Sequence, residues 1–183
     1  MRIGIVGGSF NPPHIGHAAM IQYALAREDF DEILVAPCYK HPFKDKMLSF
    51  YNRLYMCNIM VRKLFPHNVM AVDYEKEINT GRTYDLLKYL IADYPEARYT
   101  LILGDDLFFE FDKKWYKSDE IRELADIMWV PAQLYASNPV LQIRSSYIRW
   151  LLKQGKDVSH MVPKAVLEYL ESRKLVESLK EMP

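Results

Sequence analysis

The sequence predicts an α/β fold, in which helices cover both faces of a doubly wound parallel sheet and a helical part follows at the C-terminus. Two observations carry this prediction. Five short apolar runs have the composition and boundaries of buried strands, and segments with helical periodicity separate most of them. The expected strands cover residues 3–6, 32–36, 69–72, 99–103 and 127–130.

The expected helices are placed by their start and stop residues. Ser49 and Thr83 are suitable N-caps, Gly155 can end a helix, and Pro163 can begin one that runs to about Leu179. Before these, a first helix covers residues 16–27. The charges of the helix after Ser49 that we expect to be solvated are Arg53, Arg62 and Lys63.

Composition narrows the class of protein. The 183 residues, half of them hydrophobic, fit a single domain over residues 1–183, of which 144–183 form a C-terminal helical subregion. The 24 basic and 24 acidic residues cancel, so no global field attracts nucleic acid or an anionic membrane. Two cysteines are too few for a disulfide framework, which favours a cytoplasmic protein. Neither a signal peptide nor a membrane span is expected.

The most informative segment is residues 2–17, which read RIGIVGGSFNPPHIGH. A buried strand ends there at two glycines, where the backbone can approach a ligand closely. Apolar helical periodicity resumes after Gly16, and the N-terminus of a helix favours a bound anion. His14 and His17 lie three residues apart, so they can point at the same bound group with Gly16 leaving room between them. The segment therefore predicts a phosphate-handling site.

Two other interpretations of the histidine pair stay open. His14 and His17 could be a capping or core pair, or they could be two ligands of a metal site. A zinc site needs further ligands at compatible spacing, and the cysteines do not supply them. The segment matches neither the P-loop nor the GxGxxG pattern.

Polar residues also follow the other expected strands, whose carboxyl ends should meet at one ligand crevice. They are Lys40 and Lys44, then Gly104, Asp105 and Asp106, and finally Ser145, Ser146 and Arg149 at a helix start. Each group has a plainer alternative: a solvated loop, a turn cap or an ordinary capped helix. Trp115, between charged residues, is either a partly exposed stacking surface or a lid anchored in the core. Together these groups indicate a nucleoside triphosphate site.

The expected reaction is the transfer of a nucleotidyl group. No residue is an obvious nucleophile and no carboxylate pair suits acid/base work, so approximation and charge stabilisation should suffice. A phosphate of the acceptor can attack the α-phosphorus of the triphosphate, while histidine, lysine, arginine and Mg²⁺ hold the developing charge. The Mg²⁺ is expected to arrive on the ATP phosphates, without protein ligands of its own.

Residues 7–17, GGSFNPPHIGH, resemble the GGxFxPxHxGH signature of the nucleotidyltransferase superfamily, whose members join a nucleoside monophosphate to a phosphorylated acceptor. The resemblance extends to TYDLL at 83–87, LGDDL at 103–107, Trp115, SSYIR at 145–149 and MVPKAVLEYL at 161–170. With these segments the chain is similar to nicotinate/nicotinamide mononucleotide adenylyltransferases of NAD biosynthesis. The resemblance implies a Rossmann-like fold that binds ATP and a pyridine mononucleotide.

The resemblance also implies roles for individual residues. The catalytic residues would be His14, His17 and Arg149. The ATP-binding residues would be Gly7, Gly8, Ser9, Phe10, Gly16, Gly104, Asp106, Ser145 and Ser146. The acceptor-binding residues would be Lys40, Lys44, Thr83 and Trp115, with the tryptophan stacked on the pyridine ring.

Three departures from the family pattern concern the acceptor pocket more than the ATP site. Arg144 stands where the family has the first serine of ISSTxIR, residues 131–133 read PAQ instead of Arg-Pro-Gly, and residues 40–44 read KHPFK instead of PPHK. The choice between the acid and the amide acceptor therefore stays open, as does a homo-oligomer. The alternative functions are a phosphopantetheine adenylyltransferase and a nucleotide-binding regulator without turnover.

Overall fold

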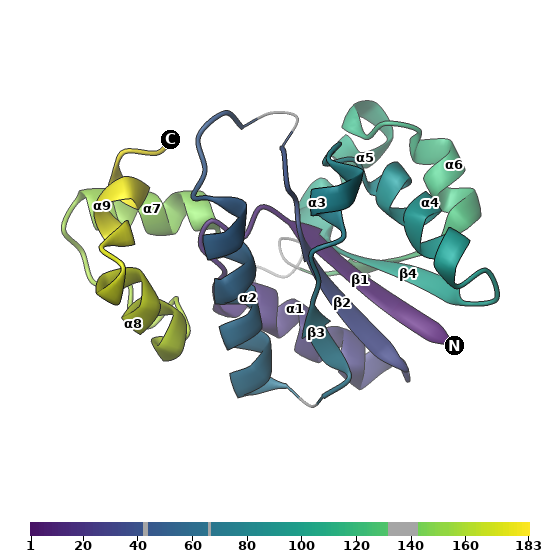
Figure 1. Ribbon diagram of the computed structural model, residues 1–183, viewed down its shortest axis with the longest axis horizontal. Helices are drawn as coiled ribbons and strands as arrows, with labels where there is room; N and C mark the ends of the chain where they lie inside the picture. Colours follow the sequence, from purple (N-terminus) through teal and green to yellow (C-terminus); the bar gives the residue numbers. More distant parts are fainter. Residues whose placement is uncertain (42–43, 66, 132–142) are drawn as a thin grey trace.

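The computed structural model describes residues 1–41, 44–65, 67–131 and 143–183, and its centre is one five-stranded sheet. The strands are β1 (Arg2–Gly8), β2 (Glu32–Pro37), β3 (Val69–Ala71), β4 (Arg98–Gly104) and β5 (Asp126–Val130). All neighbours are parallel, in the order β3-β2-β1-β4-β5 (Figure 1). This confirms the predicted fold class, and the order reverses at β1, where a crevice for ligands is expected.

Alternate residues of each strand face opposite sides of the sheet, which gives the protein two apolar cores. In β1, Val6 packs in one core, and Ile3 and Ile5 pack in the other. Gly4 lies on the same side as Val6, where an added Cβ would be only 2.9 Å from the Ile102 side chain. Burial on both faces explains why the strands read as short, nearly continuous apolar runs.

Helices cover both faces of this sheet (Figure 1). The core around Val6 contains residues of α1 (Ile15–Arg27) and α2 (Phe50–Leu64), and the other contains residues of α4 (Thr83–Asp93), α5 (Phe108–Lys114) and α6 (Ser118–Leu124). The short helix α3 (Glu75–Ile78) precedes α4, and the 3₁₀ turn η1 (Asp105–Leu107) precedes α5. Sequence periodicity did not predict α3, α5 and α6, because helices of four to seven residues are too short to show an apolar repeat.

Two predicted helix caps have different outcomes. The Ser49 hydroxyl accepts a hydrogen bond from the Asn52 N–H at 3.3 Å, which confirms the predicted cap of α2. Thr83 is the first residue of α4 and Arg82 is the N-cap, with φ −107° and ψ 124°, so the predicted Thr83 cap is wrong. A capping role for the Thr83 hydroxyl would require the helix to begin one residue later. It begins at Thr83 instead, and the extended backbone of an N-cap residue is found at Arg82.

The C-terminal residues form α7 (Ser145–Lys153), α8 (Lys164–Ser172) and α9 (Leu175–Lys180), of which α8 packs against α2. The Tyr169 hydroxyl of α8 donates to Asn52 Oδ1 of α2 at 2.9 Å. Gly155, at φ +67°, follows the end of α7 as predicted. The single helix expected from Pro163 to Leu179 is wrong, because Lys174 adopts a left-handed conformation, φ 55°, between α8 and α9.

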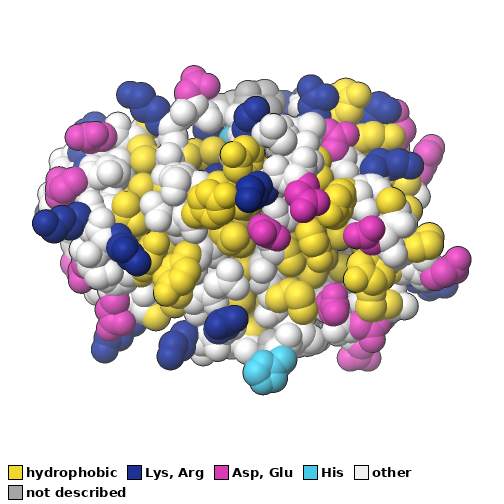
Figure 2. Space-filling view, in the orientation of Figure 1, with side chains coloured by type: hydrophobic (Ala, Val, Ile, Leu, Met, Phe, Trp, Pro, Cys, Tyr) yellow, Lys and Arg dark blue, Asp and Glu magenta, His cyan; other side chains and the backbone are white. Residues whose placement is uncertain are grey.

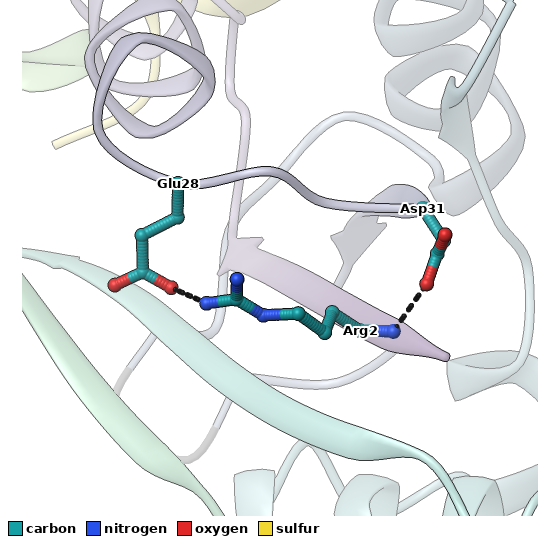
Figure 3. A network of polar contacts seen from close by, with 3 residues as sticks. All are labelled: Arg2, Glu28 and Asp31. Carbon is teal, nitrogen blue, oxygen red and sulfur yellow. Dashed lines mark hydrogen bonds and ion pairs between the residues drawn. The ribbon is translucent and has the colours of Figure 1, made fainter.

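The amino end of β1 is tied to the connection between α1 and β2 (Figure 3). The backbone N–H of Arg2 donates to Asp31 Oδ2 at 2.6 Å, and its guanidinium pairs with Glu28 Oε2 at 2.5 Å. These contacts lie at the end of the strand opposite its glycines, so they anchor the scaffold and leave the carboxyl end to the site.

The surface carries charges of both signs. On the face shown in Figure 2, lysine, arginine, aspartate and glutamate side chains are interspersed with apolar ones, in keeping with the equal totals of 24 basic and 24 acidic residues. Within the described ranges, the structure contains no helix with the length and apolar composition needed to cross a lipid bilayer.

Candidate active site

The histidine pair lies at the N-terminus of α1, after the loop that follows β1. His14 is the N-cap residue of α1, and the ring centroids of His14 and His17 are 3.7 Å apart. The His14 backbone N–H donates to His17 Nδ1 at 3.1 Å. Because Nδ1 of neutral His17 accepts this bond, its proton must sit on Nε2. His17 therefore has one remaining donor, Nε2–H.

Burial keeps both histidines neutral at pH 7. It lowers the pKa of His14 to about 3, and it lowers that of His17 well below 6.5, assisted by the nearby charges of His14 and Lys44. The capping interpretation thus describes how the pair is held, because the two histidines form a reciprocal capping box at the start of α1.

The glycines and Phe10 of this loop have distinct surroundings. An added Cβ on Gly16 would lie 3.0 Å from His14 Nδ1 and 3.2 Å from the Ile143 oxygen, so Gly16 lets α1, the histidine and Ile143 meet. Phe10 is fully buried and its ring centroid is 4.6 Å from that of His17. The structure thus places Phe10 behind His17 as a support. Around Gly7, a Cβ would meet nothing within 4 Å.

The first turn of α7 docks on the loop that carries the histidines. The Ser145 hydroxyl donates to the Pro12 oxygen at 2.8 Å, and Arg149 Nη1 donates to the Asn11 oxygen at 2.9 Å. Ser146 is exposed beside them. The two sequence motifs that were predicted to converge, about 130 residues apart, are therefore in direct contact. Arg149 also donates from Nε to the Pro183 oxygen at 2.9 Å.

The carboxyl end of β4 reaches the same place. Gly104 ends the strand, and Asp106 in η1 forms an ion pair with Arg144 at 3.2 Å. Arg144 is the N-cap residue of α7, so this pair joins the β4 end to the helix of Ser145 and Arg149. The residue that departs from the family pattern thus contacts one of the expected ATP-binding residues.

A basic cleft lies between these motifs and the segment after β2. Its volume is about 690 Å³, and it is lined by Ser9, Asn11, Lys44, Asp45, Lys46, Arg149, Lys153, Glu181, Met182 and Pro183. Lys44 Nζ donates to the Ser9 hydroxyl at 3.0 Å, and burial lowers the pKa of Lys44. Lys40 is exposed and does not line this cleft. Pro42 and Phe43 of this segment, and residues 132–142 after β5, lie outside the described residues.

Two of the residues expected to hold the acceptor, Thr83 and Trp115, lie on the other face of the sheet, whereas Lys44 lines the cleft. Trp115 follows α5 and packs on Phe111, with ring centroids 4.9 Å apart, so it is half-buried and anchored in the core. The residue after Trp115, Tyr116, lies against the start of α4, because its ring is 4.3 Å from the Arg82 guanidinium. Thr83 is the first residue of that helix. Thr83 and Trp115 are therefore brought to the same region.

Arg53 is a structural residue of the site that we predicted wrongly. It is 1% exposed rather than solvated. Its guanidinium donates to the Leu48, Ser9 and Cys38 oxygens at 2.9, 2.8 and 2.8 Å. The helical repeat could have located it, because Arg53 shares the buried stripe of α2 with Met56, Cys57 and Met60.

Carboxylates, cysteines and histidines do not gather into a metal centre in the described part of the chain, where no group of three or more could hold an ion. Cys38 and Cys57 are buried and unpaired. The donor set of the cleft is instead lysine and arginine, which suits phosphate oxygens.

Comparison with known proteins gives the family. The Cytidylyltransferase-like family model matches residues 5–150. A protein of Anaeromyxobacter dehalogenans (strain 2CP-C), named a probable nicotinate-nucleotide adenylyltransferase, is 36% identical over 180 residues, which cover 95% of this chain and 96% of the relative. The chain belongs to the nicotinate-nucleotide adenylyltransferase family. This confirms the resemblance, and with it a nucleotidyltransferase that works in NAD biosynthesis.

Solved structures agree with this family. A crystal structure of a candidate nicotinate-nucleotide adenylyltransferase from Vibrio parahaemolyticus is 31% identical, with a TM-score of 0.76, and covers 97% of this chain and 94% of its own. The nicotinic acid mononucleotide adenylyltransferase of Plasmodium falciparum, complexed with NaAD, superposes with a TM-score of 0.79 at 18% identity over 96% and 97% of the two chains. The similarity to the Plasmodium falciparum structure shows that the two chains share a fold.

Proposed function

We propose that this chain transfers the adenylyl group of ATP to nicotinate mononucleotide. A phosphate oxygen of the acceptor attacks the α-phosphorus of ATP, the bond from that phosphorus to the β-phosphate breaks, and pyrophosphate leaves. No covalent enzyme intermediate is needed, so the protein has to align the reactants and stabilise charge. The names of the relatives support nicotinate over nicotinamide mononucleotide as the acceptor.

The contact between α7 and the histidine loop carries this proposal. Ser145 and Arg149 touch the main-chain oxygens of Pro12 and Asn11, immediately before His14. A triphosphate in the adjoining cleft would meet the guanidinium of Arg149, which lines it. His14 and His17 are not among the lining residues, and we assign the Nε2–H of His17 to the nucleotide because Nδ1 is already occupied by the His14 N–H. We assign catalysis to His14, His17 and Arg149 on this basis.

The remaining assignments follow from placement around the crevice. Gly7 and Gly8 have no side chains, so the ATP phosphates could approach the protein backbone closely there. Asp106, at the end of β4, would accept hydrogen bonds from the ribose hydroxyls of ATP. Ser146 is exposed beside Arg149 and free of the docking bond that Ser145 makes. Phe10 and Gly16 act indirectly, by supporting the histidines.

On the acceptor side, we assign the mononucleotide phosphate to Lys44, and with it the exposed Lys40. Trp115 offers a flat, half-buried ring, and Thr83 lies at the N-terminus of α4 in the same region. Stacking on Trp115 would hold the pyridine ring by its face. A phosphopantetheine acceptor has no flat ring for this surface, which favours the pyridine nucleotide.

Mg²⁺ would enter this site bound to the phosphates of ATP. Basic side chains outnumber the two carboxylates of the cleft, Asp45 and Glu181, so the phosphate oxygens would hold the ion. When bound, it would neutralise part of the charge on the phosphates. Arg149 would contact the remaining phosphate oxygens of ATP, and Lys44 the phosphate of the acceptor. The unpaired cysteines support a cytoplasmic location for the reaction.

Pyrophosphate release tests the proposed function. The purified chain is incubated with ATP, Mg²⁺ and one of three acceptors: nicotinate mononucleotide, nicotinamide mononucleotide or 4′-phosphopantetheine. We expect the fastest release with nicotinate mononucleotide. Release with 4′-phosphopantetheine alone would support the alternative adenylyltransferase, and tight ATP binding without release from any acceptor would support a regulator.

A further inference from the structure

Glu75 is a buried carboxylate that the proposed reaction does not use. It is 4% exposed, at the first position of the short helix α3 between β3 and α4. The backbone N–H groups of Tyr39 and Gly81 lie close to its side chain and, as donors, partly oppose the rise in its pKa that burial causes. One of its oxygens, Oε2, is buried without a hydrogen-bond partner among the described residues. Glu75 thus joins two segments that are 42 residues apart.

These two segments are both assigned to the acceptor. Tyr39 precedes Lys40 in the segment that leads to Lys44, and Gly81 lies two residues before Thr83 at the start of α4. They are in close contact, because an added Cβ on Gly81 would lie only 2.0 Å from the Lys40 oxygen. Gly81 also has φ +68°, so a side chain at this position is excluded for two reasons.

A buried cation contacts the same segment. Arg53 Nη2 donates to the Cys38 oxygen at 2.8 Å, and the N–H of the next residue, Tyr39, lies close to the Glu75 carboxylate. Residues 38 and 39 thus have a guanidinium at one carbonyl and a carboxylate near the following amide. Arg53 also binds the Ser9 oxygen, at 2.8 Å, which fixes the same segment relative to the glycine loop of the ATP side.

We propose that Glu75 is a positioning residue for the acceptor: its carboxylate holds the segment of Lys40 and Lys44 against the turn that leads to Thr83. This inference rests on the proposed function and deepens it. The ATP side has a contact of its own, the docking of α7 on the histidine loop, in which Glu75 takes no part. Loss of the Glu75 carboxylate should therefore weaken acceptor binding selectively.

The charge on Glu75 supports a functional rather than a stabilising role. Burial is the main cause that raises its pKa, to about 7, and the Asp85 charge in the first turn of α4 adds to this, while the two backbone donors oppose it. The other titratable groups facing this turn are the Cys38 thiol, whose pKa burial raises, and Arg53. Because the folded pKa lies above the unfolded value of 4.5, the charged form of Glu75 lowers stability as pH rises from 4.5 to about 7.

Steady-state kinetics of the full chain test this proposal, with ATP and nicotinate mononucleotide varied separately. We expect Glu75→Gln to raise the KM for nicotinate mononucleotide about tenfold, as loss of one charge-assisted contact would, with the KM for ATP within about twofold. Glu77→Gln is the matched control, because Glu77 lies in the same helix, is exposed, and bonds only the Tyr89 hydroxyl among the contacts described. It should change neither KM.

Two further readouts separate positioning from a structural role. In the wild-type chain, the acceptor KM should rise as pH falls through about 7, because protonation removes the carboxylate charge, and this dependence should be absent in Glu75→Gln. At a pH about one unit above that pKa, Glu75→Gln should melt at the same temperature as the wild type or higher, since it removes a buried charge.

The outcomes that would overturn the proposal are distinct. Equal rises in both KM values with a lower melting temperature would make Glu75 a structural residue, and an unchanged acceptor KM with an unchanged pH profile would remove its role altogether. Glu75→Asp is a second variant in which partial recovery of the acceptor KM is expected. If the wild-type chain released no pyrophosphate with any acceptor, the proposed function would fail, and this inference with it.

Discussion

Arg149 in α7 donates from Nη1 to the backbone oxygen of Asn11 at 2.9 Å, so the last third of the chain contacts the loop before the histidine pair. The Ser145 hydroxyl makes a parallel contact with Pro12. These two bonds bring the donors of α7 to the cleft at the carboxyl end of β1. The site is therefore closed by two segments that are far apart in the sequence.

This contact leads to a prediction for Arg149→Lys. A lysine keeps the positive charge and loses the planar fork, which donates to the Asn11 and Pro183 oxygens and, in the proposed site, to a phosphate. We expect the KM for ATP to rise about tenfold, with a smaller effect on the acceptor. Separate titrations of ATP and acceptor in the pyrophosphate assay measure it. Lys164→Gln, whose side chain is 91% exposed in α8, is the control.

His17→Ala removes the Nε2–H donor that we assign to the ATP phosphates, the Nδ1 atom being occupied by the His14 N–H. We expect kcat to fall by roughly two to three orders of magnitude, as loss of one preorganised donor to a developing charge would cause, with a smaller effect on ATP binding. Single-turnover kinetics separate the chemical step from binding. Wild-type turnover in a variant that is folded by circular dichroism would mean that His17 serves only the packing of Phe10 and His14.

Trp115→Ala should affect the acceptor rather than ATP. Loss of a stacking surface costs on the order of 1–3 kcal/mol, so the KM for the pyridine mononucleotide should rise about tenfold or more. Trp150→Ala is a matched control, because Trp150 is 54% exposed on α7 and stacks on Tyr147. A change confined to the KM for ATP would contradict the stacking assignment.

Arg53→Met should destabilise the fold and the site together. It removes the donor from the carbonyls of Leu48, Ser9 and Cys38, and each unsatisfied buried group costs roughly 1–3 kcal/mol, so we expect a loss of about 3 kcal/mol or more. Urea unfolding measures it. Arg62→Met on the same helix is exposed and should stay within about 0.5 kcal/mol of the wild type. Equal stability of both variants would contradict the role of Arg53.

Prediction from sequence succeeded where the information is local. The apolar runs of β1, β2, β4 and β5 identified buried parallel strands, because both faces of each strand lie in a core. The Ser49 cap depends only on a hydroxyl and an amide three residues later, and it was correct. The histidine spacing likewise indicated a pair, and the rings are in contact.

Prediction failed where the outcome depends on neighbours that are remote in the chain. Arg53 was expected to be solvated because it is charged. It is buried because Ser9 and Cys38, which follow the ends of β1 and β2, offer carbonyl oxygens to its guanidinium. Lys174 interrupts an apolar helical pattern that looks continuous, so α8 and α9 are separate helices. Periodicity could have placed Arg53 on the buried stripe of α2, but it gives neither the carbonyl partners of the guanidinium nor the break at Lys174.

The sequence alone determined the class of this protein: the five strands and the longer helices between them, the glycine and histidine loop, and the family that these residues resemble. Only the tertiary structure decided that Ser145 and Arg149 touch that loop, that Arg144 pairs with Asp106, and that Glu75 joins two distant turns. The physical reason is that strand and helix patterns arise from the repeat of the backbone, over a few residues. Burial and polar contacts depend on which segments the sheet brings together, and that depends on the whole chain.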